Sequence, residues 1–183
     1  MRRFNAILSM GVLVLFLVHA IAGGFQLAGL IPGGNTVMQV LAWIMAGLIC
    51  VHMVIGIKLT ADTLRAIRRS GKSYFKENAL FWARRISGFA VMLFIAAHIV
   101  LFLGKNEDGA FRLSYFGTLQ LISQLLLVIS VAVHVITNIR PLMTGLGIRS
   151  YGKFAFDILF VLSVLLFFAG AGFVIYFIRW KLI

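Results

Sequence analysis

The segment Leu80–Leu103, LFWARRISGFAVMLFIAAHIVLFL, decides the fold of this chain. After Arg85 it runs to its end without a charged side chain, and it carries one imidazole, His98. About 20 apolar residues in a helix cross the roughly 30 Å hydrocarbon core of a bilayer. The segment therefore predicts a membrane-spanning helix, and an ionisable residue inside such a helix is a candidate functional residue.

Four other segments have the same character. The chain has 183 residues, of which 62% are hydrophobic, and its mean hydropathy of +1.04 lies outside the range of ordinary soluble domains. In lipid only helices or closed barrels satisfy every backbone group, and these segments lack the alternation of a strand. The sequence predicts an all-α integral membrane bundle in one domain, residues 1–183, with short connections and antiparallel sequential neighbours. The five predicted helices are about residues 4–30, 37–59, 80–103, 113–139 and 154–178.

The basic residues predict the orientation in the membrane. Thirteen of the 17 lie before the first helix or in the second and fourth connections. By the positive-inside rule this places the N-terminus in the cytoplasm and the C-terminus outside, in the cytoplasmic membrane. Topology and anionic lipid also account for the net charge of +12, so no nucleic-acid partner is expected. Met1-Arg2-Arg3 imitates a secretory signal, but the apolar run that follows is longer than the usual h-region of about 7–15 residues. We expect it to be retained as the first membrane helix.

Each of the first four predicted helices contains one of the four histidines of the chain: His19, His52, His98 and His134. At 1.5 Å per residue, His52 and His134 lie about 9 Å from the basic ends of their helices, and His98 and His19 lie roughly 20 and 24 Å from that edge. The histidines therefore form an inner pair, His52 with His134, and an outer pair, His19 with His98. Each pair comes from alternate helices, as a flat ring held across a bundle requires.

Two imidazoles at each of two levels are the axial ligands that two haem irons need. A single buried histidine is more often a packing residue, but two depth-matched pairs are hard to explain in that way. Zinc would favour cysteine or carboxylate ligands that converge at one depth. Cys50 is the only cysteine, and no C-x-x-C-H motif is present, so the haem would be non-covalent haem b. An iron with imidazole on both faces has no open position, so it passes electrons and does not activate oxygen.

Several neighbours of the histidines are candidate cofactor-binding residues. Gly23 and Gly56 follow His19 and His52 by one turn, where a missing side chain would let a porphyrin edge approach the backbone. Ser87 lies eleven residues before His98, three turns away and nearly in line with it. Ser87 and the residues one turn from His134 would orient an imidazole or bind a propionate. Basic residues at the inner edge would neutralise propionates, although each can equally mark the membrane edge. These polar and basic candidates are Ser87, Ser130, Asn138, Lys58, Arg84, Arg85 and Arg140.

With these residues the chain resembles the single-chain, two-haem cytochrome b anchor of succinate:quinone oxidoreductases, a family that includes quinol:fumarate reductases. The resemblance rests on five helices, histidines in the first four only, a basic second connection, and the stretch Trp82–Gly88 followed by Phe94 and His98, which is similar to the family's arginine–serine–glycine…histidine stretch. It covers nearly the whole chain, and the histidine arrangement is its most specific part.

The resemblance implies that His19 and His98 bind the distal haem and that His52 and His134 bind the proximal haem. It further implies a flavoprotein and an iron–sulfur subunit docked on the basic cytoplasmic surface, with electrons exchanged with a membrane quinone such as menaquinone. In this respiratory-chain complex the flavin chemistry of succinate dehydrogenase or fumarate reductase would belong to the partner. This chain would only transfer electrons and bind quinone.

The chain departs from the family near His134. Some members place a glutamate there for proton movement, whereas Ser130–His134 contains no carboxylate, so a glutamate-based proton path is doubtful. The quinone site is weakly marked: Gln26, Gln39, Gln120 and Gln124 would bond a quinone carbonyl, but bonds between helices are their commoner role. Two alternatives stay open. One is a cytochrome b subunit of a hydrogenase or formate dehydrogenase, and the other is a small histidine-containing membrane transporter.

Overall fold

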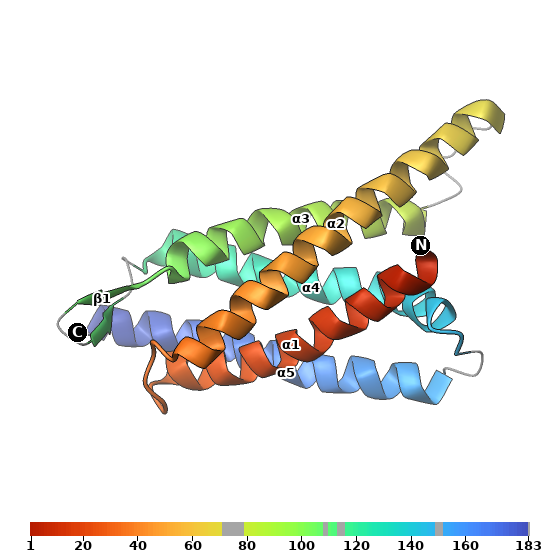
Figure 1. Cartoon of the computed structure of the whole chain (residues 1–183). Helices are drawn as coiled ribbons and strands as arrows, with labels where there is room; N and C mark the ends of the chain where they lie inside the picture. Colours follow the sequence, from red (N-terminus) through yellow and green to blue (C-terminus); the bar gives the residue numbers. More distant parts are fainter. Residues whose placement is uncertain (71–78, 108–109, 113–115, 149–151, 183) are drawn as a thin grey trace.

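The computed structural model describes residues 1–70, 79–107, 110–112, 116–148 and 152–182. These contain five long helices, α1 (Arg2–Ala28), α2 (Thr36–Ser70), α3 (Ala79–Phe102), α4 (Thr118–Gly145) and α5 (Gly152–Leu182). All five are long and apolar enough to cross a membrane, which confirms the predicted helical membrane fold. The two termini lie at opposite ends of the bundle (Figure 1). A small antiparallel hairpin, β1 (Lys105–Glu107) and β2 (Ala110–Arg112), occupies the third connection, where the sequence predicted no strand.

Four of the helices form a packed body. α4 packs against α3 and α5, and α1 packs against α5 and α4. Glycines let α1 and α5 approach closely: a Cβ on Gly172 would lie 3.5 Å from the Cα of Gly24, and a Cβ on Gly24 would overlap the ring of Phe168. Without a hydrophobic force between helices in lipid, such small-residue contacts supply the van der Waals packing that holds the helices together.

α2 is the exception to this packing. Among the described elements it packs against α1 only, and it crosses the bundle at an angle (Figure 1). The expectation that sequential helices are neighbours is therefore wrong for α2 and α3, which make no such contact. A cavity lined by residues of α2 and of the other helices lies between them.

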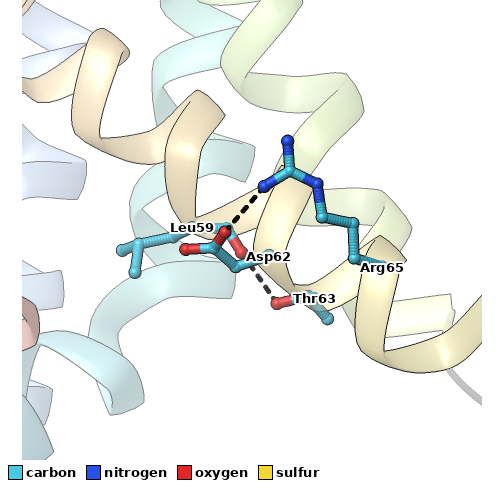
Figure 2. A network of polar contacts seen from close by, with 4 residues as sticks. All are labelled: Leu59, Asp62, Thr63 and Arg65. Atoms are coloured by element: carbon cyan, nitrogen blue, oxygen red, sulfur yellow. Dashed lines mark hydrogen bonds and ion pairs between the residues drawn. The ribbon is translucent and has the colours of Figure 1, made fainter. Parts of the chain in front are cut away.

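The C-terminal end of α2 projects beyond the other helices (Figure 1). Its 35 residues span about 52 Å, more than the roughly 40–45 Å of a whole bilayer. Local bonds support the projecting end (Figure 2): Arg65 pairs with Asp62 at 3.4 Å, and the Thr63 hydroxyl donates to the Leu59 carbonyl at 2.8 Å. Leu59–Ser70 makes no hydrogen bond to another described element.

The bounds of α4 differ from the predicted ones at both ends. Of the predicted start, residues 113–115 lie outside the described residues, and the helix begins at Thr118, where the Gln120 side chain accepts a hydrogen bond from the Gly117 N–H at 3.1 Å. The helix then continues through Pro141 to Gly145, although the sequence predicted its end near residue 139. Proline removes one backbone donor and commonly ends a helix, so a compensating bond must be present.

Arg84 on α3 supplies that bond. In an α-helix the N–H of residue 141 would bond to the carbonyl of residue 137, and proline has no N–H. The Arg84 Nε donates instead to the Thr137 carbonyl, at 2.8 Å. α4 therefore passes through Pro141 with that carbonyl satisfied from a neighbouring helix.

Candidate functional site

A single large cavity contains all four histidines. It has a volume of about 2680 Å³ and is lined by residues of all five helices, including Gly23, Gly56 and Asn138. Pockets for one small ligand are typically about 300–1,000 Å³. The cavity therefore has room for two large ligands, one at each histidine level.

The structure makes the two pairs that helix depth predicted. The ring centroids of His19 and His98 are 5.9 Å apart with planes at 76°, which forms the outer pair. Those of His52 and His134 are 6.4 Å apart at 89°, which forms the inner pair. Each pair faces across the cavity from two different helices.

These separations fit a metal ion held between two imidazoles. Two metal–nitrogen bonds of about 2.0–2.1 Å plus two ring radii of about 1.1 Å give roughly 6.3 Å between ring centroids. Edge-to-face ring pairs in direct contact have centroids about 4.5–7 Å apart, so the spacing is compatible with a metal and does not by itself require one. Within the described residues, no group of three or more His, Cys, Asp or Glu converges on one point, so each level offers two such ligands.

Hydrogen bonds from neighbouring helices hold three of the four imidazoles by Nδ1. His52 Nδ1 lies 3.2 Å from Ser9 Oγ, His134 Nδ1 lies 3.3 Å from Ser87 Oγ, and His98 Nδ1 lies 2.7 Å from Gln124 Oε1. In metal sites a histidine commonly donates its second ring N–H to such a partner, which fixes the ring orientation.

The donor of the bond to His98 can be assigned, because the amide oxygen of Gln124 can only accept. His98 therefore carries its proton on Nδ1, which leaves the lone pair of Nε2 available to a metal. Ser9 Oγ and Ser87 Oγ also lie within hydrogen-bond distance of a backbone carbonyl, Asn5 O at 2.8 Å and Arg84 O at 3.2 Å. A hydroxyl proton given to that carbonyl makes the serine oxygen an acceptor, and His52 and His134 then have the same Nδ1–H tautomer.

The same contacts measure the distance between the two levels. Each of three helices carries a residue that bonds a histidine of one pair, and it also carries a histidine of the other pair. These residues are Ser9 and His19 on α1, Ser87 and His98 on α3, and Gln124 and His134 on α4. Within each helix the two residues are ten or eleven apart, which gives about 15–16 Å between the levels. The three helices give the same value, so α1, α3 and α4 together fix the spacing between the two pairs.

Two of the predicted neighbours lie at the inner pair. Ser87, which the sequence placed in line with His98, bonds His134 instead, because α3 and α4 are adjacent there. The Asn138 amide donates to the His134 carbonyl at 2.7 Å, so it supports the backbone behind the imidazole.

The predicted glycines leave open space beside two of the ligands. A Cβ added to Gly23 or Gly56 would meet nothing within 4 Å, although both residues line the cavity. This fits the expectation that a ring edge approaches the backbone at these positions.

The basic residues gather at the inner mouth of the cavity. Arg84 is partly committed to the Thr137 carbonyl, and Arg85 lies over the Phe81 ring at 4.9 Å. The Arg85 Nε is buried and has no hydrogen-bond partner in the structure. Within the described residues the only ion pair is Arg65–Asp62, so no carboxylate of that part of the chain pairs with these guanidinium groups. The arginines that line the mouth are Arg2, Arg3, Arg84, Arg85 and Arg140.

The glutamines divide between structure and cavity. Gln124 holds His98 and Gln120 caps α4, as expected for bonds that organise helices. Gln26 and Gln39 line the cavity, and the Gln26 amide donates to the Pro32 carbonyl at 3.4 Å. Of the four glutamines, these two are therefore the ones that remain available to a ligand.

Two residues of the site were missed in the sequence. Ser9 holds His52, and a Cβ on Gly88 would lie 3.4 Å from the His134 ring, so Gly88 makes room for that ligand. Gln124 was expected to bond between helices, but its bond to His98 was not foreseen. The ten-residue spacing of Ser9 from His19 and of Gln124 from His134, beside the eleven-residue spacing of Ser87 from His98, was the available signal.

Comparisons with known protein families, with curated proteins and with solved structures find no match to this chain. The site geometry must therefore support any functional conclusion.

Proposed function

We propose that this chain is a two-haem b-type cytochrome of the membrane, which transfers electrons between a soluble partner and a membrane quinone. The observation that carries the proposal is the pairing of four imidazoles across one cavity, at centroid separations of 5.9 and 6.4 Å. A haem iron between two imidazoles supplies one-electron oxidation and reduction with no open coordination position.

The residues present fit such a group. Ser9, Ser87 and Gln124 bond the Nδ1 atoms of His52, His134 and His98, which leaves the Nε2 side of each ring for the iron. Gly23 and Gly56 leave space for the edges of a flat ring. At the inner level the arginines of the cavity mouth, Arg84 and Arg85 among them, would bind propionates, since no carboxylate of the described residues pairs with them.

Within this class we propose the membrane anchor of a succinate dehydrogenase or fumarate reductase complex. The resemblance of the histidine pattern supports this choice, with His19 and His98 at the distal haem and His52 and His134 at the proximal haem. The asymmetric charge supports a cytoplasmic N-terminus, a C-terminus outside, and docking of an iron–sulfur subunit and its flavoprotein at the basic end. Menaquinone is the proposed quinone.

The test is the haem-to-polypeptide ratio of the detergent-purified chain, from pyridine haemochrome and reduced-minus-oxidised spectra. We expect two non-covalent b haems per chain. One haem per chain would contradict the two-pair assignment. A colourless protein made with ample haem would contradict the cytochrome and favour a transporter.

Purification of the tagged chain from its native membrane tests the partner separately. We expect a flavoprotein and an iron–sulfur protein to copurify, with succinate or fumarate activity. A copurifying hydrogenase or formate dehydrogenase would keep the cytochrome and replace the complex.

A further inference from the structure

Among the described elements, α2 packs against one helix and makes one side-chain hydrogen bond to another helix. Among the described elements it packs against α1 only, and its one side-chain hydrogen bond to another helix joins His52 to Ser9 of α1. The other side-chain bonds of α2 stay within the helix. The place of His52 relative to His134 is therefore set through α1, a helix that carries neither residue.

We propose that Ser9 is a positioning residue for the inner pair, which fixes the ring orientation and the tautomer of His52 and fastens α2 to the bundle at that level. The proposal rests on the proposed function for its spectroscopic readout. A second readout, the tautomer of each histidine, is independent of haem.

The chemistry of Ser9 suits this role. Its oxygen lies 2.8 Å from the Asn5 carbonyl and 3.2 Å from His52 Nδ1. With its proton on the shorter contact, the serine oxygen accepts from His52 Nδ1. An alanine at this position keeps the helix but removes the acceptor. The His52 ring is then free to rotate and to place its proton on either nitrogen, because no other side chain of the described residues bonds it. His134 keeps its own acceptor, Ser87, in the same variant.

The chain offers a matched control. Ser163 on α5 makes the same kind of bond within its own helix, to the Phe160 carbonyl at 2.7 Å, and is exposed and away from the histidines. Ser9→Ala is therefore compared with Ser163→Ala, and Ser9→Thr tests whether a hydroxyl alone restores the function.

The first readout is the low-spin electron paramagnetic resonance spectrum and the haem retention of the purified protein. We expect Ser9→Ala to weaken haem affinity about 10- to 100-fold at one of the two sites, as is typical when a partner of a metal-ligating histidine is lost. The signal of that site shifts and the other signal is unchanged. Ser9→Thr and Ser163→Ala match the unmodified chain.

The second readout uses the full chain from a haem-deficient host, labelled with ¹⁵N at its four histidines. The ring nitrogen shifts report each tautomer, and His52→Gln assigns the His52 signals. We expect an Nδ1–H tautomer at His52, a mixture in Ser9→Ala, and the first state again in Ser9→Thr.

Unchanged His52 shifts together with unchanged haem retention in Ser9→Ala would overturn the proposal, and so would equal loss at both sites. If no variant and no unmodified chain binds haem, the proposed function fails. The nitrogen shifts then decide the role of Ser9 alone.

Discussion

The shortest hydrogen bond to a histidine ring among the described residues joins His98 Nδ1 to Gln124 Oε1, at 2.7 Å. Gln124 is completely buried, and its amide nitrogen donates to Ser123 Oγ at 3.0 Å. A buried polar group left unpaired costs about 1–3 kcal/mol, so this glutamine specifies how α3 and α4 pack at the outer level. Three side chains that looked unrelated in the sequence thus have the same role, since each bonds the ring of a histidine on another helix. They are Ser9, Ser87 and Gln124.

Removing an inner ligand should remove one haem and spare the other. We expect His52→Ala and His134→Ala each to lower the haem-to-polypeptide ratio from two to one, because the outer pair lies about 15–16 Å away on the helix axes. The residual spectrum should be the same in both variants and should differ from that of His98→Ala. Retention of two haems by either inner variant would contradict the pairing.

The residues of the site were predictable where their own chemistry is unusual in a membrane. Four imidazoles in apolar helices stand out, and their depths gave the pairs. Ser9 was not predictable, because a serine near a helix start is ordinary and its value depends on how α1 crosses α2. Ser87 was assigned to the wrong histidine because a sequence shows the neighbours within a helix and not those across an interface.

At the scale of the helices, Arg84 and Pro141 act as a pair on neighbouring elements. The Arg84 Nε donates to the Thr137 carbonyl, which Pro141 cannot bond because it has no N–H. This bond lies between the level of Ser87 and the end of α4. Arg84 therefore has a structural role besides any contact with a propionate.

A double-mutant cycle measures this pair. Arg84→Ala should lower the free energy of unfolding by about 1–3 kcal/mol, because it leaves the Thr137 carbonyl unsatisfied. In a Pro141→Ala background the helix supplies its own N–H, so the same change should cost less. Thermal unfolding of the four proteins in one detergent gives the coupling. Additive effects would show that Arg84 stabilises α4 in another way.

The extent of the helices followed from hydropathy, but their ends and neighbours did not. Five apolar runs gave five spans because the bilayer fixes the length of a helix that crosses it. Pro141 misled the prediction of the α4 end, since its compensation comes from α3. The lack of contact between α2 and α3, which line the same cavity, is a tertiary feature that no local pattern encodes.

At the scale of the whole molecule, α2 stands apart from a body made of α1, α3, α4 and α5. Each proposed haem would lie in the cavity between α2 and this body, one at the inner level and one at the outer level. His52 is the ligand that α2 contributes. Bound ligand would therefore replace the helix contacts that α2 lacks.

Limited trypsin digestion tests this arrangement. Arg65, Arg68 and Arg69 are exposed at the projecting end of α2, so they should be cut first whether or not haem is present. Cleavage at Lys58, at the base of that end, should be several-fold faster in chain made without haem, because α2 then has support from α1 alone. Mass spectrometry of the fragments gives the two rates. Equal rates at Lys58 would show that α2 is held independently of haem.

The isolation of α2 also bears on how such a protein is made. In the proposed cytochrome, all five helices would be inserted and the body assembled before any prosthetic group arrives, and the tetrapyrroles would then enter sideways from the lipid, between α2 and α3, which make no contact. In that case the last contact of α2 to form would be with a small molecule that the cell synthesises separately from the chain. A cell short of tetrapyrrole would carry immature chain with a loose second helix, open to membrane proteases. The abundance of the finished complex would then follow cofactor synthesis without any change in transcription.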